Sequence, residues 1–211
     1  AVKAAQGGKR PVSPDRHEAE PVTLVIDIGG EGLKMIVLDH TGAPLTPRHR
    51  QLTPYPATPQ AILDVISRMV TELPAFDRVS VGFPGVVVRG TILTAPNLGT
   101  DVWRSHDLGA ELTRLTGRPT RVLNDADLQG YGVIAGTGVE MVLTLGTGLG
   151  TALYVDGRLV PNLELGHHPF RKERTYEERV CKRELDRIGK KRWSQRVAEM
   201  VEQLAPIWNY D

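Results

Sequence analysis

The sequence has one cysteine, few aromatic residues and no long hydrophobic run. Cys181 alone excludes an intramolecular disulfide and any metal site built from several cysteines. No apolar stretch approaches the roughly 20 residues that a membrane-spanning helix needs, and the N-terminal region lacks a signal-peptide apolar segment. We therefore expect a globular protein with no membrane partner, in a reducing, cytoplasmic setting.

The charge is balanced overall but uneven along the chain. The net charge is +1, whereas residues 171–196 carry eleven Lys and Arg against five Asp and Glu, a local +6. Such a run is most often a solvated helix face, and otherwise marks a surface for an anion such as a phosphate chain. Aromatic residues do not interleave regularly with these charges for base stacking, so we expect no nucleic-acid partner.

The length and pattern predict an α/β protein of two lobes. The 211 residues are 40% apolar, enough to bury a sizeable core. Residues 1–21 are polar and predict a disordered tail. The order strand, glycine loop, strand, turn occurs at 24–42 and again at 141–160, so the second half resembles a duplicate of the first. We place an N-terminal lobe at 22–137 and a C-terminal lobe at 138–211.

Hydrophobic periodicity predicts the individual elements. Apolar runs at 22–27 and 33–39 predict an antiparallel pair, and further strands are expected at 79–83 and 119–123. Helices are expected at 61–73, 107–115, 125–134, 173–187 and 192–207.

Two glycine-rich loops follow apolar strands. The first, DIGGEGLK at 27–34, places Asp27 ahead of Gly29 and Gly30, and the second, TLGTGLGT at 144–151, adds the hydroxyls of Thr147 and Thr151. Each alone could be an ordinary tight turn. On two facing halves, the loops would clamp a phosphate chain with backbone N–H groups and hydroxyls, while Asp27 holds Mg²⁺ or its water.

Polar residues at three other points could serve a sugar and its phosphorylation. Asn124 and Asp125 stand where a strand meets a helix, most often an N-cap, yet a carboxylate on that rim can also take a proton from an attacking hydroxyl. Asn97 follows a strand as a turn residue or a hydroxyl ligand. Glu164 and His167 could begin a metal site, but no Cys or His cluster completes one, so hydroxyl recognition is favoured.

Six motifs stand in the order found in the ROK family of sugar kinases. They are DIGGEGLK, FPG at 83–85, APN at 95–97, LNDAD at 123–127, LGTGLGT at 145–151 and ELGH at 164–167. From residue 24 to 211 the chain resembles this family, and most of all its polyphosphate-using glucokinases. The resemblance implies an actin-like ATPase fold of two RNase H-like lobes around a central cleft.

The resemblance also implies roles for particular residues. Asp125 would be the general base on the 6-hydroxyl of glucose or a close hexose. The other sugar hydroxyls would be held by Asn97, Asn124, Glu164 and His167. Mg²⁺ and the donor, polyphosphate or ATP, would be bound by Asp27, Gly29, Gly30, Lys34, Gly146, Thr147 and Gly148. Family members are often dimers, so a homodimer is allowed.

The sequence departs from the family pattern in three places. Glu31 stands where Ser or Thr is common, and a carboxylate about 4 Å from a phosphate costs roughly 4 kcal/mol, on the order of a thousandfold in binding. The alternative function is therefore a catalytically impaired relative that only binds sugar or phosphate. The single cysteine implies no zinc. The family continues beyond the last helix, so we expect an incomplete C-terminal lobe.

Overall fold

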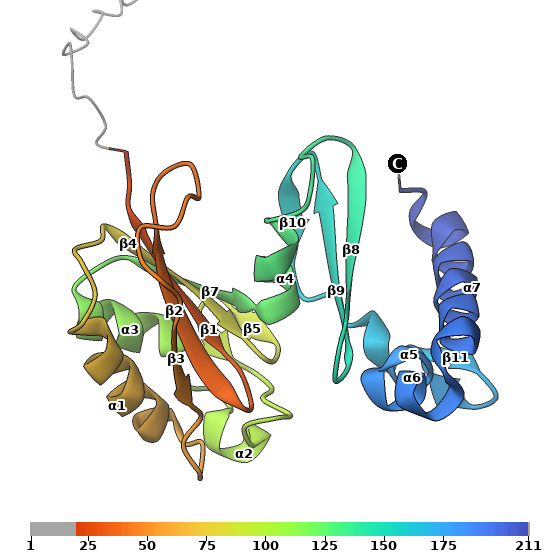
Figure 1. Cartoon of the computed structure of the whole chain (residues 1–211), viewed down its shortest axis with the longest axis horizontal. Helices are drawn as coiled ribbons and strands as arrows, with labels where there is room; N and C mark the ends of the chain where they lie inside the picture. The colour runs from red at the N-terminus through yellow and green to blue at the C-terminus, as the bar shows by residue number, and fades with distance from the viewer. Residues whose placement is uncertain (1–19, 211) are drawn as a thin grey trace, which may run out of the picture.

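The computed structural model describes residues 20–210, which form two β-sheets with helix α4 between them (Figure 1). The predicted disordered tail lies outside the described residues, except for its last two. The main strands are β1 (Thr23–Ile28), β2 (Gly32–Leu38), β3 (His49–Leu52), β4 (Arg78–Phe83), β7 (Thr120–Asn124), β8 (Val139–Leu145), β9 (Leu149–Val155) and β10 (Arg158–Val160). Two short hairpins are β5 (Val87–Val88) with β6 (Thr91–Ile92), and β11 (Pro169–Arg171) with β12 (Arg174–Thr175).

Seven α-helices and one short 3₁₀ helix complete the described part of the chain. They are α1 (Pro59–Val70), α2 (Thr100–Trp103), α3 (Leu108–Thr116), α4 (Asp125–Gly130), the 3₁₀ helix η1 (Leu165–His167), α5 (Tyr176–Val180), α6 (Lys182–Ile188) and α7 (Lys190–Trp208). No described helix is both long enough and apolar enough to cross a membrane.

The first sheet has the strand order β3-β2-β1-β4-β7. Strands β1 and β2 pair antiparallel, with Asp27 opposite Lys34, whereas β4 runs parallel to β1 and β7 parallel to β4. The expected antiparallel pair and the two later strands are confirmed. Strand β3 was not predicted, because its sequence HRQL is polar and three of its four residues are exposed.

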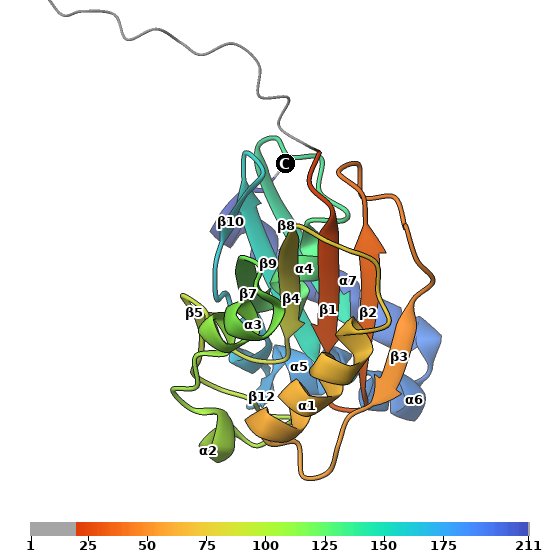
Figure 2. The same cartoon turned by 90° about the vertical axis from the view of Figure 1, so that its left-hand side faces the viewer.

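Helices α1 and α3 cover one face of the first sheet, in front of it in Figure 2. The N-cap of α1 is Thr58, whose hydroxyl accepts a hydrogen bond from the Ala61 N–H. The helix buries Ile62 and Ile66. Helix α3 overlaps the predicted helix 107–115; its N-cap is Asp107, and its C-cap is Gly117. These helices and the sheet enclose the larger hydrophobic core. The opposite face of the sheet is turned toward α4.

The second sheet is antiparallel, in the order β10-β9-β8. Helix α4 packs against both sheets: Gly82 of β4 approaches the backbone of Asp125, and Gly150 of β9 lies against Ala126. The Tyr154 hydroxyl donates to the Asp127 carbonyl at 2.5 Å. Because α4 contacts both sheets, the boundary between lobes at 137 and 138 stays a prediction.

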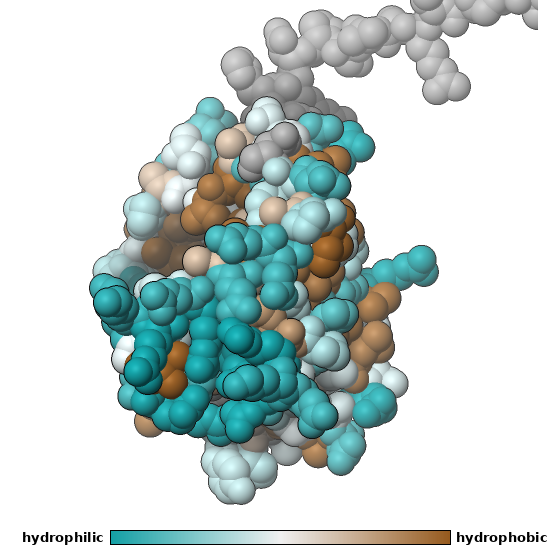
Figure 3. Space-filling view, turned by 90° about the vertical axis from the view of Figure 1, so that its right-hand side faces the viewer, coloured by the Kyte–Doolittle hydropathy of each residue, from teal (hydrophilic) through white to brown (hydrophobic). Residues whose placement is uncertain are grey.

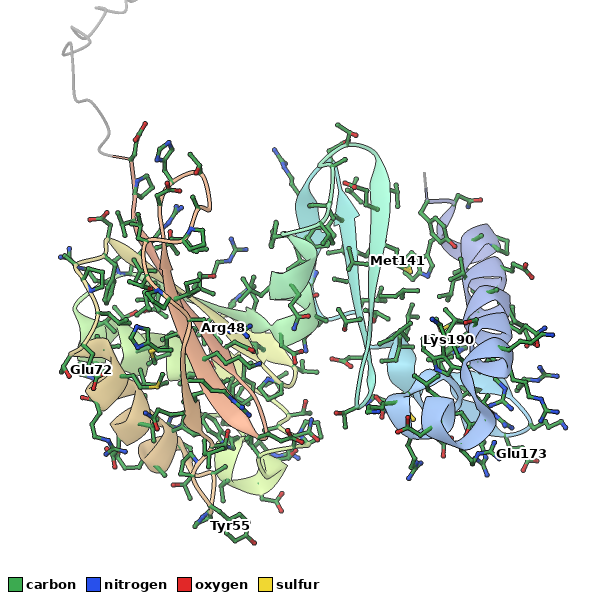
Figure 4. The ribbon with its side chains drawn as sticks, in the orientation of Figure 1. Arg48, Tyr55, Glu72, Met141, Glu173 and Lys190 are labelled. Carbon is green, nitrogen blue, oxygen red and sulfur yellow. The ribbon has the colours of Figure 1, made fainter. Side chains whose placement is uncertain are left out.

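The C-terminal helices differ from those expected. The predicted helix 173–187 begins too early and is not continuous, since residues 173–175 belong to a hairpin, and Thr175 starts α5 through a capping box with Glu178. The chain turns extended at Cys181, with ψ of 165°, which separates α5 from α6. Helix α7 begins at Lys190 rather than at residue 192, and α4 stops at Gly130 rather than at residue 134. Figure 4 shows Met141 of β8 pointing toward α7, where a second, smaller core forms.

Candidate active site

A cavity of about 720 Å³ lies between the two sheets, beside the N-terminus of α4. Its wall includes ten of the twelve site residues expected from the sequence. They are Gly29, Gly30, Asn97, Asn124, Asp125, Gly146, Thr147, Gly148, Glu164 and His167. Segments that are distant in the sequence therefore converge on one space large enough for a small ligand.

The first glycine loop turns between β1 and β2 directly against Asn97. The Gly29 N–H donates to the Gly32 carbonyl at 3.0 Å, which closes the turn. The Thr53 hydroxyl donates to the Gly29 carbonyl at 2.5 Å. A side chain at position 30 would come within 3.3 Å of the Asn97 Cβ. Glycine at this position therefore lets the loop and Asn97 share one wall of the cavity.

The second glycine loop joins β8 to β9 on the other side of the cavity. The Gly146 N–H donates to the Gly148 carbonyl at 3.0 Å, and the Gly146 carbonyl accepts from the Lys182 N–H at 2.7 Å. A side chain at position 148 would overlap the carboxylate of Glu177. The loop is therefore fixed from behind by α5 and α6, while Thr147 stays exposed at its tip.

At the junction of β7 and α4, Asn124 caps the helix and Asp125 faces the cavity. The Asn124 side chain accepts from the N–H groups of Ala126 at 2.8 Å and Asp127 at 3.3 Å, and it donates to the Gly85 carbonyl at 3.1 Å. The N-cap is thus Asn124, and three of its hydrogen bonds go to the backbone. The Asp125 carboxylate, which also accepts from the Ala126 N–H at 2.8 Å, lines the cavity.

Three carboxyl groups on or near α4 have raised pKa values, and their charges affect one another. Burial raises the pKa of Asp125 above its ordinary value, and the charge of Asp27 raises it further, whereas the Ala126 N–H and Lys34 lower it. Burial also raises the pKa of Glu164, against the opposing effect of His167. Burial raises the pKa of Asp127 to about 6, helped by the charges of Glu164 and Asp125. Of the three, Asp125 and Glu164 line the same cavity, and carboxyl groups with raised pKa values in one cleft are typical of sites that move protons.

The segment that carries Glu164 is held by Thr151. The Thr151 hydroxyl donates to the Leu163 carbonyl at 2.5 Å and accepts from the Leu165 N–H at 3.3 Å. Thr151 is 4% exposed and does not line the cavity. The expectation that its hydroxyl meets a phosphate is therefore wrong. The hydroxyl instead makes hydrogen bonds to the backbone on both sides of Glu164, at Leu163 and Leu165.

The two remaining predicted residues, Asp27 and Lys34, line a second cavity of about 490 Å³. Their side chains form an ion pair of 2.7 Å across the β1–β2 ladder, and both are partly exposed. Asp125 lines both cavities, so it lies between this pair and the glycine loops. Arg48 points from the first sheet toward α4 and lines the same second cavity (Figure 4).

At Asp27 the protein offers a magnesium ion one carboxylate, so water and phosphate would have to supply its other ligands. The described residues contain no group of three or more His, Cys, Asp or Glu side chains placed to hold a metal. One carboxylate completed by water and substrate phosphates is a common way of binding Mg²⁺. The partly exposed Asp27 carboxylate meets this requirement.

Two glutamates lie in places that the sequence analysis did not expect: Glu31 is away from the cavities, and Glu177 is on the wall of the main one. Glu31 is exposed and is not part of the wall of either cavity. Glu177, which the sequence analysis did not single out, lines the main cavity and accepts from the Leu149 N–H at 3.1 Å. Its only sequence signal is its place in the first turn of an acidic helix start, which many surface helices share.

Comparison with known proteins also finds the ROK family, as the motifs predict. A family model described as ROK family matches residues 23–182. The chain is 38% identical over 154 residues to a polyphosphate glucokinase of Mycobacterium tuberculosis, covering 67% of this chain and 56% of the relative. It is 34% identical over 151 residues to a glucokinase of Streptomyces coelicolor, covering 65% and 45%. The chain thus spans about half the length of the curated relatives it matches.

Solved structures show the same fold. The inorganic polyphosphate/ATP-glucomannokinase of Arthrobacter sp. strain KM superposes with a TM-score of 0.70 at 37% identity, covering 79% of this chain and 71% of that one. A ROK family glucokinase of Streptomyces griseus, in complex with glucose and AMPPNP, gives a TM-score of 0.68 at 26% identity, covering 88% and 64%. The fold is the actin-like ATPase fold expected from the motifs, and the chain belongs to the ROK family of sugar kinases and their relatives.

Proposed function

We propose that this chain carries the sugar-binding and donor-binding residues of a hexose kinase. Such an enzyme transfers a phosphoryl group from polyphosphate or ATP to the 6-hydroxyl of glucose or a close hexose. The observation that carries the proposal is the position of Asp125, at the carboxyl end of β7 on a cavity wall that both glycine loops share. The polyphosphate glucokinases and glucokinases among the relatives support the reaction class.

Asp125 is the proposed general base. The 6-hydroxyl oxygen attacks the terminal phosphorus, the bond from phosphorus to the leaving phosphate breaks, and the hydroxyl proton passes to the Asp125 carboxylate. The raised pKa of Asp125 suits this role, because it brings the basicity of the carboxylate nearer to neutral pH. The ionised form is still required, so the reaction needs a pH above that pKa.

The sugar is assigned to the part of the cavity between Asn97 and η1. Asn97 offers an amide, Glu164 and Glu177 offer carboxylates, and His167 offers a ring nitrogen, all on the same wall. Such a mixture of donors and acceptors matches several neighbouring hydroxyl groups. Asn124 keeps one amide hydrogen free of its capping bonds for the same purpose.

The phosphoryl donor is assigned to the space between the glycine loops. Gly29 and Gly30 approach it from the first sheet, and Gly146, Thr147 and Gly148 approach it from the second. The Asp27–Lys34 pair borders the second cavity on the far side of Asp125. Mg²⁺ bound through Asp27 would neutralise charge that develops on the donor, and Lys34 supplies a further positive charge.

The alternative function, a relative that binds without catalysis, depends on repulsion between Glu31 and the donor. Because Glu31 is exposed and lies outside both cavity walls, that repulsion is screened by water. A catalytic protein is therefore preferred.

The test is formation of glucose 6-phosphate from glucose with polyphosphate or with ATP, in the presence of Mg²⁺. We expect product that depends on glucose and on one of the donors, and formation of product at least about 10²-fold slower with Asp125→Asn. Absence of product with both donors, from a folded chain that still binds glucose in calorimetry, would establish the binding protein instead.

A further inference from the structure

We propose that α6 and the first turn of α7 form a binding track for the distal phosphates of an inorganic polyphosphate whose reacting end lies at the second glycine loop. The track consists of Arg183, Lys190, Lys191 and Arg192. This inference deepens the proposed function, since it rests on the donor lying between the glycine loops. It assigns the basic run of the sequence to a particular ligand and a particular surface.

The track starts at the glycine loop itself. The backbone N–H of Lys182, the first residue of α6, donates to the carbonyl of Gly146 at 2.7 Å. Arg183 is the next residue and is exposed. A phosphate chain leaving the cavity past Gly146 therefore meets α6 first. Gly189 separates α6 from α7, and Lys190, Lys191 and Arg192 form the first turn of α7, which packs against α6.

The positive charges of the basic run are not equivalent. Four are neutralised by carboxylates: Arg171 pairs with Glu199, Lys182 with Asp186, and Arg187 and Arg196 both bind Glu184. Arg179 is buried, and its guanidinium donates to the Arg171 carbonyl. These five residues therefore have partners in the described structure, whereas Lys172 and Arg174 of the same run are exposed cations of the β11–β12 hairpin and lie outside the track.

The four track residues, by contrast, are exposed, and within residues 20–210 their side chains form no hydrogen bond or ion pair. In Figure 3 the face made by the C-terminal helices shows a broad hydrophilic surface over its lower half. Uncompensated cations that are close together attract a polyanion, because each bound phosphate displaces counterions from the chain. A surface that served only as a solvated helix face would gain stability from alternating signs, which is what the other part of the run shows.

Polyphosphate fits this surface better than a nucleic acid does. Single-stranded nucleic acids bind through aromatic side chains that stack on bases, as well as through cations. Trp193, the aromatic residue that follows the track in the sequence, is partly buried, and its indole N–H donates to the Val180 carbonyl at 2.8 Å. The surface thus supplies charge without a stacking platform, which matches a chain that has phosphates and no bases.

The experiment compares the wild-type chain with a variant in which all four track residues are changed to Gln. A matched control carries four Gln substitutions at exposed arginines on the first-sheet side, and these are Arg68, Arg104, Arg118 and Arg121. Circular dichroism establishes that all three proteins fold. Calorimetry at several salt concentrations then measures binding of long-chain polyphosphate, of tripolyphosphate and of a single-stranded oligonucleotide.

We expect the track variant to bind long-chain polyphosphate at least about tenfold more weakly than wild type and control do. The slope of log affinity against log salt should fall by up to about 3, since each neutralised charge of a single-stranded polyanion contributes about 0.7. Tripolyphosphate, which is short enough to stay at the loop, should change by less than about twofold under the same comparison.

Three results would overturn the inference. Long-chain affinity could be the same in the track variant and the wild type, or tripolyphosphate affinity could fall as much as long-chain affinity does. The oligonucleotide could also bind as tightly as polyphosphate and lose that binding in the same variant, which would assign the surface to nucleic acid. If instead the track variant loses polyphosphate binding but the wild type forms no glucose 6-phosphate, the proposed function fails and the track stands.

Discussion

The backbone N–H of Leu149 donates a hydrogen bond of 3.1 Å to the carboxylate of Glu177, 28 residues further along the chain. The bond ties the end of the second glycine loop to α5, and it uses one of the N–H groups that such a loop could offer to a phosphate. Because Glu177 also lines the cavity that Glu164 and His167 line, this contact lies between the proposed donor side and the proposed sugar side of the site.

Replacing Glu177 by Gln should weaken glucose binding by about tenfold and leave donor binding nearly unchanged. Gln keeps an oxygen to accept from the Leu149 N–H but removes a charged acceptor, and hydrogen bonds to charged groups contribute about 1.5–3 kcal/mol. Calorimetry with glucose and with each donor measures both affinities. Glu173→Gln, an exposed change in the nearby hairpin, is the control. Loss of donor affinity with intact glucose affinity would place Glu177 on the donor side instead.

Much of the fold was predictable because its core strands alternate apolar and polar residues. The burial of β1 follows this alternation residue by residue. The ends of α3 carry residues that are typical of helix caps, Asp107 at the N-terminus and Gly117 at the C-terminus. Strand β3 carries no such pattern, since it pairs by backbone at the edge of the sheet and buries little. The break at Cys181 escaped prediction because periodicity continues on both sides of it.

The candidate site was predictable where a residue's role depends on its local position. Asp125 follows directly from its place at the end of β7, and the glycine loops follow from their composition. Glu177 and Thr151 have roles that depend on contacts with backbone groups 28 and 12 residues away. Sequence patterns do not report such contacts, so Glu177 was missed and Thr151 was assigned to the wrong partner.

Replacing Asp125 by Asn should lower kcat by about 10²- to 10⁴-fold, the usual contribution of a general base. Glucose affinity should change by less than about threefold, because Asn keeps the size of Asp and one of its two acceptor oxygens. In the wild-type chain the raised pKa of Asp125 places the acidic limb of the rate profile above the ordinary aspartate range. Steady-state rates across pH, with Asp101→Asn as an exposed control, measure both effects. An Asn variant with normal kcat would remove Asp125 from the chemistry.

Replacing Glu31 by Thr should change the KM for either donor by less than about threefold. The Glu31 side chain is exposed and outside both cavity walls, so water and salt screen its charge from the donor. The matched comparison is Thr147→Glu, which puts a carboxylate on the cavity wall, and there the donor KM should rise at least about tenfold. A large gain in donor affinity from Glu31→Thr would show that Glu31 does reach the donor and that the binding-only alternative deserves preference.

Replacing Asp127 by Asn should stabilise the protein more at alkaline pH than at acidic pH. Burial raises the pKa of Asp127 from 3.8 to about 6, so between those values the folded chain binds a proton that the unfolded chain has released. The free energy of unfolding of the wild-type chain therefore falls as pH rises through that window. Asn carries no charge and still offers an oxygen to the Asn162 backbone N–H. Urea unfolding at pH 8 should show the variant more stable by about 1–3 kcal/mol, with a smaller gain at pH 4.5. Asp101→Asn should show no such pH dependence, and an equal gain for Asp127→Asn at both pH values would mean that the buried carboxyl is not the cause.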